Sequence, residues 1–426
     1  MSVVTLFGCS IIAQAEVPAP SPDWLTKNIR VLTMFDYQDP ASSTQNPDNA
    51  FARLYRYSGE VDLRPDLIVD TPIVGWSFKP RVTYFYRWWE DGVTKGERDD
   101  EARFFVNEWM IQPKPTDNLF LSFGKEKLLW GNSFLVSPSN ILFRDTEKVN
   151  PKAEVEGKYL AQVTWLPSSS VTVNLIGRTQ KEENALGESA QPVRSVKVDV
   201  VGGSYLVSLI NYFQQHERFR LGSYGQWTAS DAVVLYYDGI VSKGTDVLYP
   251  VVDPGLQLSG EFQRTNAGSG RLYPAVTAGG SYTFLSGETL SLEFLYNGAG
   301  YNDDEADAYY QLRQNAALHF LDSSPIGALS QKTLVQSLFT GSDLLRRYYL
   351  MAQLQSREIK NVLNIIVRYT HGLEEHAGQT SSIIEWKMTD RLEFFNINTV
   401  AVSRGRDTEF NALLDKSFLA GVEAHF

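Results

Sequence analysis

The chain ends in the stretch Ser417-Phe418-Leu419-Ala420-Gly421-Val422-Glu423-Ala424-His425-Phe426, and this stretch decides the fold. Every second residue is apolar and belongs to one row: Phe418, Ala420, Val422, Ala424 and Phe426. Successive side chains of a β-strand point to opposite faces, so the segment would present one apolar face and one smaller, mostly polar face. An unpaired last strand of this kind invites aggregation, whereas pairing with the first strand of the same chain removes both edges. The stretch therefore predicts a closed barrel, with a buried last strand of a soluble β-protein as the alternative.

Composition narrows the class of protein. The chain has 426 residues, with 9 Trp, 21 Tyr and 23 Phe, and a mean hydropathy of −0.23. That combination suits a barrel with a wet interior and aromatic girdles around an apolar outer band. A formal net charge of −11 argues against nucleic-acid binding, and a single Cys excludes a disulfide framework and a Cys-based metal or haem motif. No run approaches the roughly 20 apolar residues of a spanning helix, so we expect any membrane crossing to use strands.

The first residues are typical of an export signal. An apolar stretch ends at Ala13-Gln14-Ala15, a plausible cleavage site, which predicts a signal peptide over 1–15 and a Pro-rich periplasmic leader over 16–27. No Lys or Arg precedes Lys27, so the usual basic start is absent and the sequence predicts a true start upstream. Leu6-Phe7-Gly8-Cys9 also resembles a lipoprotein processing site, which is the weaker alternative. Either signal takes the chain out of the cytoplasm, and the transmembrane barrel is expected over 28–426.

Alternating segments separated by short and long connections recur along the chain. From Trp76 to Trp88, aromatic and apolar side chains hold the even positions, and Lys79, Arg81 and Arg87 hold odd ones, a period of two that a helix would not give. Pro80 makes the register there uncertain, because a proline cannot donate to the ladder. Seventeen such segments run from Phe51 to Phe426, and parity adds one over 28–37, with Ile29, Val31, Thr33 and Phe35 outward. The sequence therefore predicts an all-β, antiparallel up-and-down transmembrane barrel of about 18 strands, with 16 as the alternative, short periplasmic turns and long extracellular loops.

The last strand resembles that of bacterial outer-membrane β-barrel proteins, which commonly end in Phe. The resemblance implies a Gram-negative outer membrane, contact with lipid and lipopolysaccharide, and recognition of Phe418, Val422 and Phe426 by the barrel assembly machinery. A soluble propeller or sandwich is the competing architecture. It would need repeated blade motifs, which the sequence lacks, and it would not explain the signal, the loop rhythm and the terminal Phe together.

A barrel of this size normally encloses an aqueous lumen, so the polar face of each strand should carry function. The bases on that face are the candidate lumen and selectivity residues: Arg30, Arg56, Lys79, Arg81, Arg87, Arg178, Lys197, Arg218, Arg220, Arg347, Arg368 and Lys387. The acids in the same phase are Glu60, Asp62, Glu108, Glu126, Asp199, Asp238, Glu293, Glu385 and Glu423. Rings of bases favour anion passage, whereas pairing across strands would merely hold the wall. Both interpretations stay open, and the strand phases over 103–113 and 391–403 are ambiguous.

The connection 128–157 follows the fifth predicted strand and is unusually apolar for a loop. Because an exposed apolar patch is a liability, we expect the loop to fold into the barrel mouth and narrow it. The candidate constriction residues are Trp130, Phe134, Asn140, Phe143 and Arg144. Gly124-Lys125-Glu126, Trp130-Gly131 and Ser137-Pro138-Ser139-Asn140 resemble a pattern of alginate-export-like porins. That resemblance implies an 18-stranded channel for an anionic or sugar-like solute.

The remaining motifs point to no chemistry of their own. A helical pattern runs over 303–321, with Asp303 or Asp304 as its cap, and would form a lid over the pore or a calcium site. His371 and His376 flank a polar loop, and no hydrolase, metalloprotease or phosphate-binding motif occurs, so no enzyme, metal or cofactor is expected. The leading interpretation is a porin-like channel for small hydrophilic solutes. The alternatives are a sheath or scaffold for a periplasmic partner, a cytochrome or an export component, and then an outer-membrane hydrolase.

Overall fold

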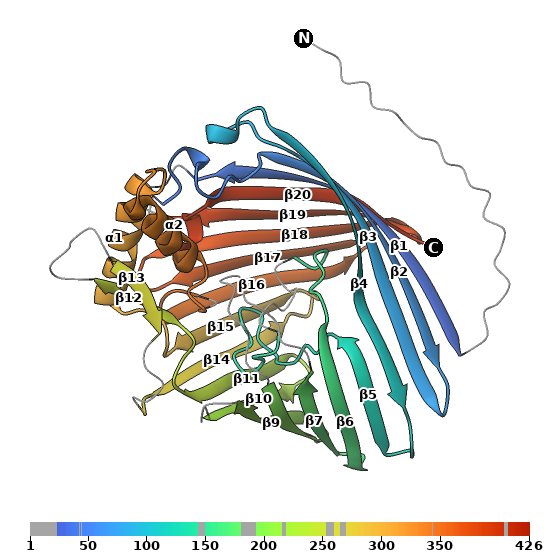
Figure 1. The fold of residues 1–426 in the computed structure, drawn as a ribbon. Helices are drawn as coiled ribbons and strands as arrows, with labels where there is room; N and C mark the ends of the chain where they lie inside the picture. The colour runs from blue at the N-terminus through green and yellow to red at the C-terminus, as the bar shows by residue number, and fades with distance from the viewer. Residues whose placement is uncertain are drawn as a thin grey trace.

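The computed structural model describes residues 24–41, 43, 45–143, 150–179, 193–214, 219–252, 260–264, 270–342, 344–403 and 408–426. An antiparallel sheet of 18 strands closes on itself (Figure 1). Its strands are β1 (Leu25–Pro40), β2 (Tyr57–Asp70), β3 (Val74–Trp88), β4 (Arg98–Pro113), β5 (Leu119–Glu126), β6 (Lys158–Ser168), β7 (Val171–Arg178), β8 (Val193–Val201), β9 (Tyr205–Gln214), β10 (Phe219–Ser230), β11 (Val233–Lys243), β14 (Leu272–Thr283), β15 (Thr289–Asn297), β16 (Tyr348–Ile359), β17 (Leu363–Gly372), β18 (Ala377–Thr389), β19 (Leu392–Val402) and β20 (Leu414–His425). The predicted strand number is confirmed. No helix in the described part of the chain is long and apolar enough to cross a membrane.

The barrel closes between its first and last strands. β1 pairs with β20 from Arg30 opposite His425 to Pro40 opposite Leu414. The backbone of Phe426 adds the final rung, since its N–H donates to the carbonyl of Ile29 at 2.9 Å and its carbonyl accepts from the N–H of Ile29 at 3.2 Å. The predicted pairing of the two ends is confirmed. It leaves no sheet edge, which is what a strand structure in a bilayer requires.

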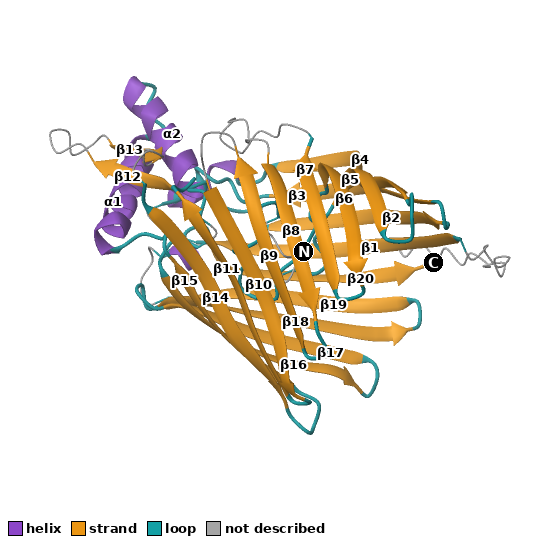
Figure 2. Cartoon of the chain, turned by 90° about the horizontal axis from the view of Figure 1, so that it is seen from below, coloured by secondary structure: helices purple, strands orange, loops and turns teal. Residues whose placement is uncertain are grey.

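The two faces of the barrel differ as the alternation predicts. Phe35, Val82 and Phe418 are each more than 40 % exposed on the outer face, as a lipid-facing surface requires. Glu423, between outward neighbours on β20, is only 4 % exposed and points inward. Tyr57 stacks on Trp88 on adjacent strands near the long-loop end, where an aromatic girdle is expected. Short turns join the strands at the end that carries Phe426, and the longer connections lie at the opposite, extracellular end (Figure 2).

A β-bulge explains the ambiguous phase over 103–113. Lys79 lies opposite Glu108, whereas Pro80 lies opposite Val106, so Asn107 is an extra residue on β4. Pro80 has no N–H to give the ladder, and a bulge opposite it removes the need for one. The outward positions of β4 therefore change parity along the strand, from Phe104 (70 % exposed) to Ile111 (43 % exposed). In β19, Val400 and Val402 face outward and Phe395 faces inward.

The start predicted at Phe51 for the second strand is wrong. β2 begins at Tyr57, and Phe51 instead packs edge-on against Phe320. The Asn46 side chain accepts from the backbone N–H groups of Phe51 and Ala52, at 3.2 and 3.0 Å. These side-chain bonds offer the backbone an alternative to the ladder. The first strand, in turn, begins at Leu25, three residues before the expected start of the barrel.

Two further pieces cover part of the extracellular end. A hairpin of β12 (Leu248–Val252) and β13 (Gly260–Arg264) lies beside α1 (Asp303–His319) and α2 (Pro325–Leu338) (Figures 1 and 2). The predicted helix is thus present but ends at His319, and its N-cap is Asn302 rather than Asp303 or Asp304. Asn302 and Glu305 form a reciprocal capping box, which explains the start. The sequence analysis missed the hairpin and α2, whose N-cap Ser324 is followed by Pro325.

We expect that deleting Phe426 lowers the folded fraction. The deletion removes two backbone hydrogen bonds of the closing seam, each of about 1 kcal/mol, together with the last side chain of the outward row. The measurement is heat-modifiable migration on gels of protein extracted from cells. Phe426→Tyr keeps the backbone bonds and an aromatic ring and is the matched control. Equal folded yields of the deletion and the wild type would contradict the role given to this residue.

Candidate functional site

The connection 127–157, called the inward loop below, lies inside the barrel and contacts opposite walls. Its first part, up to Phe143, contacts inward side chains between β6 and β15. Its last part, from Asn150, contacts β18 to β20 and β1 to β5. Figure 1 shows it in teal and green between β5 and β6, in the interior. Residues 144–149 lie outside the described part of the chain.

The first anchor of the inward loop is Glu293 on β15. Its carboxylate accepts from the N–H groups of Phe134 and Leu135, at 2.6 and 2.9 Å, and from the Ser133 hydroxyl at 2.9 Å. Glu293 itself is 2 % exposed. Hydrogen bonds to a charged group contribute about 1.5–3 kcal/mol each, so one buried carboxylate holds this turn of the loop firmly.

The second anchor is Asp238 on β11. Its carboxylate accepts from the N–H of Ser139 at 2.8 Å and from the Ser137 hydroxyl at 2.9 Å. Gly131 lies so close that an added Cβ would overlap Ser137 and Asp238, and its φ of +97° is a conformation that favours glycine. Glycine at position 131 is therefore required by the close approach of the loop to the wall.

The last part of the loop carries its own charges to the opposite wall. Lys152 donates to Glu393 on β19 at 2.7 Å and to Glu423 on β20 at 2.8 Å. Glu154 lies 2.5 Å from Nε of Arg81 on β3 and 3.1 Å from Nη2 of Arg30 on β1. Burial acts to raise the pKa of Glu154, but the Arg81 hydrogen bond and the neighbouring guanidinium groups hold it below the usual range. Lys152 and Glu154 were not predicted as site residues, because they belong to a run of charged residues from Arg144 to Glu156 in which no local pattern distinguishes them.

An apolar cluster supports the middle of the loop. Leu142 and Phe143 are each 2 % exposed and pack with inward side chains of the wall: Leu160, Ile176, Val193, Ile210, Tyr212, Tyr224 and Ile240. Burying a side chain of this size contributes about 1.5–3 kcal/mol. The inner wall is therefore apolar where the loop lies on it, which a water-filled lumen alone would not explain.

The structure brings four of the five candidate constriction residues into the interior. Trp130 packs against the apolar cluster and under the ammonium group of Lys197, and the Phe134 ring meets Tyr236 edge-on. Asn140 is 2 % exposed and links two parts of the loop, because its Nδ2 donates to the carbonyl of Leu128 at 3.0 Å. Arg144 lies outside the described residues. That these residues set the narrowest passage stays a prediction.

Most of the candidate lumen bases have a carboxylate partner within 4 Å. Eight do so: Arg30, Arg56, Lys79, Arg81, Arg87, Lys197, Arg220 and Arg347. Arg56 precedes β2 and Arg347 precedes β16, so both lie in extracellular connections rather than at the strand positions expected for them. Arg368 donates to Gln353 at 2.7 Å, Arg178 is half-buried at the end of β7, and Lys387 is exposed near the short-turn end of β18. Arg218 lies outside the described residues.

A pair of carboxylates ties the extracellular connections together. Glu409 accepts from the N–H of Leu345 at 2.7 Å and from the Tyr349 hydroxyl at 2.5 Å. Glu375 accepts from Tyr310 on α1 at 2.7 Å and from the N–H of Glu409 at 3.3 Å. Burial, and then the charge of Glu375, raise the pKa of Glu409 to about 8, and burial raises that of Glu375.

Three more charged residues adjoin this cluster: Arg346, Glu374 and Asp303. Arg346 lies 3.6 Å from Glu374 and also pairs with Asp303, the first residue of α1. Asp303 thus forms an ion pair and Glu305 belongs to the capping box. The described residues contain no group of three or more His, Cys, Asp or Glu side chains placed to hold a metal.

We expect the extracellular connections to loosen as pH rises. The pKa of Glu409 is about 8 in the folded loops against 4.5 when the loops open, so between these values the folded state holds a proton that the open state lacks. The free energy of opening therefore falls as pH rises through this window, by at most about 1.4 kcal/mol per unit. Limited proteolysis of intact cells should be faster at pH 9 than at pH 6.

Glu409→Gln should remove this difference, because an amide does not titrate. Asp304→Asn, at an exposed acid on the same face, is the control and should keep the difference. A proteolysis rate that is independent of pH in the wild type would contradict the prediction.

Comparison with known proteins finds a likeness in fold only. No protein-family model matches the chain, and no curated protein sequence matches it. Solved structures do match. OccAB1 of Acinetobacter baumannii is 10% identical with a TM-score of 0.55, over 94% of this chain and 96% of that chain. OccK11 (OpdR) of Pseudomonas aeruginosa is 11% identical with a TM-score of 0.53, over 94% and 96%. A BenF-like porin from Pseudomonas fluorescens is 10% identical with a TM-score of 0.53, over 94% and 98%.

These neighbours establish the type of barrel. The chain has the 18-stranded fold of Gram-negative outer-membrane porins, and an outer-membrane location agrees with the apolar outer face. The sequence resemblance to alginate-export-like proteins is not supported. At this identity, the solutes of the neighbours say nothing about the solute of this chain.

Proposed function

We propose that the chain forms an outer-membrane channel for small hydrophilic solutes, narrowed by its own inward loop. The observation that carries the proposal is the anchoring of one loop to both sides of the barrel, through Glu293 and Asp238 on one side and Lys152 and Glu154 on the other. A loop bonded to both walls reduces the free cross-section of the lumen. Most of the candidate wall bases lie beside a carboxylate, so we infer weak selection between anions and cations and selection mainly by size and by contacts in the narrow part.

The alternative as a sheath for a cytochrome or an export component receives less support. A sheath requires a lumen open to a partner, whereas here the chain's own loop holds carboxylates and guanidinium groups on both walls. The alternative as an outer-membrane hydrolase receives the least support. The ring of His371 stacks on Tyr369 with its Nδ1 at 3.1 Å from the phenol oxygen, and His376 lies in the turn before β18.

Releasing the first half of the inward loop from the wall tests whether this loop narrows the lumen. In Glu293→Gln with Asp238→Asn, five charge-assisted hydrogen bonds to the loop lose their charge, each weakened by about 1 kcal/mol or more. We expect a larger and noisier single-channel conductance in planar bilayers, and the largest conductance on deletion of 132–144. Glu358→Gln with Asp117→Asn, two acids near the short turns, is the matched control. Conductance unchanged by the deletion in a folded barrel would reject the constriction.

Ion selectivity has a separate test at Glu154. Its carboxylate offsets the charge of Arg30, Arg64 and Arg81, which lie 3.1, 3.9 and 2.5 Å away. Glu154→Gln should expose positive charge in the lumen and shift the reversal potential in a salt gradient toward anions. The Debye length is about 8 Å at physiological salt, so the measurement needs dilute salt. Glu90→Gln, on an exposed connection, should leave the potential unchanged; equal potentials of the wild type and Glu154→Gln would show that these charges lie outside the ion path.

A further inference from the structure

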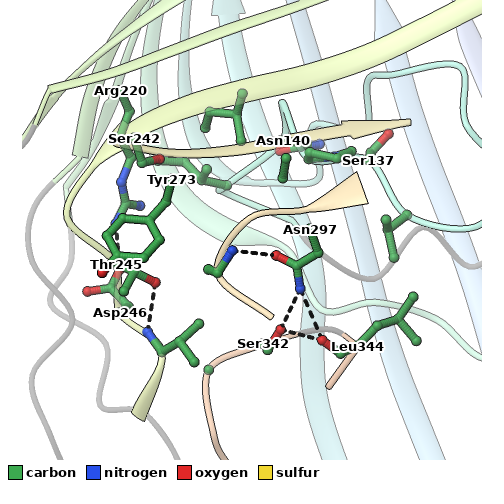
Figure 3. A pocket seen from close by; sticks show the side chains of 18 of the residues that line it. Ser137, Asn140, Arg220, Ser242, Thr245, Asp246, Tyr273, Asn297, Ser342 and Leu344 are labelled. Atoms are coloured by element: carbon green, nitrogen blue, oxygen red, sulfur yellow. Dashed lines mark hydrogen bonds and ion pairs between the residues drawn. The ribbon is translucent and has the colours of Figure 1, made fainter. Parts of the chain in front are cut away.

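A cavity of about 120 Å³ lies between the inward loop and the wall, toward the extracellular end (Figure 3). The inward loop contributes residues 136–141, and β10, β11, β14 and β15 contribute inward side chains. The connection at 244–247, together with Gly341, Ser342 and Leu344 of a second connection, completes it from the extracellular side. A solute entering from outside would thus meet the cavity before the anchors at Glu293 and Asp238.

The cavity holds one pair of opposite charges. Nη2 of Arg220 on β10 lies 2.5 Å from Oδ2 of Asp246, and these are the only charged residues among its described lining residues (Figure 3). Arg220 is 6 % exposed, and its Nε has no hydrogen-bond partner within the described part of the chain. A buried donor without a partner costs about 1–3 kcal/mol, so a ligand that accepts from it recovers that free energy.

The rest of the lining is uncharged and mixed in character. Hydroxyl groups come from Ser242 and Tyr273, and apolar side chains such as Ile240 and Leu295 alternate with them. Binding sites for small molecules commonly combine apolar walls with a few placed polar groups. Here those polar groups are hydroxyls, the amides of Asn140 and Asn297 and one ion pair, which suits a molecule that has both hydroxyl groups and C–H faces.

The extracellular side of the cavity is held in place before any ligand binds. The Asn297 amide donates to Ser342 at 3.0 Å and to the carbonyl of Leu344 at 3.1 Å (Figure 3). Gly341, at a φ of +80°, lies so close to the carbonyl of Asp246 that a Cβ would be only 2.9 Å from it. A preformed site avoids the cost of ordering these segments on binding.

We propose that this cavity binds a small, neutral, polyhydroxylated solute of about monosaccharide size. The proposal rests on the channel function proposed above and names the class of solute. The cavity volume of about 120 Å³ is several times the roughly 10–15 Å³ that admits a single water, so the cavity has room for a small solute of several non-hydrogen atoms. A charged solute binds less well, because its charge meets a like charge in either Asp246 or Arg220 and competes with their pairing.

The test is single-channel current recording with three probes of equal size: D-glucose, D-gluconate and D-glucosamine. D-Glucose should interrupt the current at lower concentrations than the other two. Arg220→Gln with Asp246→Asn keeps the cavity neutral but removes the charge-assisted donor, and should weaken glucose binding by about tenfold or more. Ser242→Leu, opposite Arg220 on the neighbouring strand, reduces the cavity volume while both charged residues stay in the chain, and should have a similar effect. Lys114→Gln with Asp70→Asn, an ion pair near a short turn, is the matched control.

The outcomes separate this proposal from the channel function. A folded wild-type barrel without conductance would reject the channel, and the subsite with it. Normal conductance with no interruption by glucose, or with interruption by gluconate or glucosamine at equal or lower concentrations, would reject only the subsite. If the double variant does not fold, as judged by heat-modifiable migration on gels, the test rests on Ser242→Leu. Glucose binding to Ser242→Leu that equals binding to the wild type would overturn the proposal.

Discussion

Backbone hydrogen-bonding groups that are removed from water must find partners, and this constraint shapes both the barrel and its interior. At the closing seam the partners are other backbone groups, since β1 and β20 pair down to Phe426. Inside the barrel, the first part of the inward loop, from Leu128 to Phe143, forms no strand ladder. There, two wall carboxylates accept from the N–H groups of Phe134, Leu135 and Ser139. A loop apolar enough to leave water is thus held by a few charged acceptors that the wall supplies.

The architecture could be predicted from patterns of neighbouring residues in the sequence. Strand number, closure and the inward fold of the connection after β5 follow from alternation, parity and the apolar character of that loop, all of which are read over neighbouring residues. The structure differs from the prediction where a strand depends on a residue outside it. The bulge at Asn107 depends on Pro80 in the adjacent strand, and the delayed start of β2 depends on the side chain of Asn46. No alternation in a single strand reveals either.

The candidate site was harder to predict because its charges pair across long sequence separations. Arg30 and Arg81 belong to different strands, yet both meet Glu154 of the inward loop. A count of inward bases left both an anion path and paired wall charges open, and the contacts place a carboxylate beside most of these bases. In the proposed channel, selection would therefore rest on the shape and hydrogen bonding of the narrow part and of the cavity beside Arg220 rather than on net charge. The extracellular connections were hard to predict for the same reason. Glu375 and Glu409 come together only when three of these connections pack against one another.

The most direct test of the account is the distance between the inward loop and the wall in the assembled protein. Ser137 donates to Asp238 at 2.9 Å, and the chain's single Cys lies at position 9, more than 100 residues before both in the sequence. Ser137→Cys with Asp238→Cys should therefore react with a short thiol-specific crosslinker in outer membranes, and the crosslinked barrel should keep a low, quiet conductance. Two cysteines that are each labelled freely from outside, yet never crosslink in a folded barrel, would show that the loop does not lie against this wall and would contradict the account.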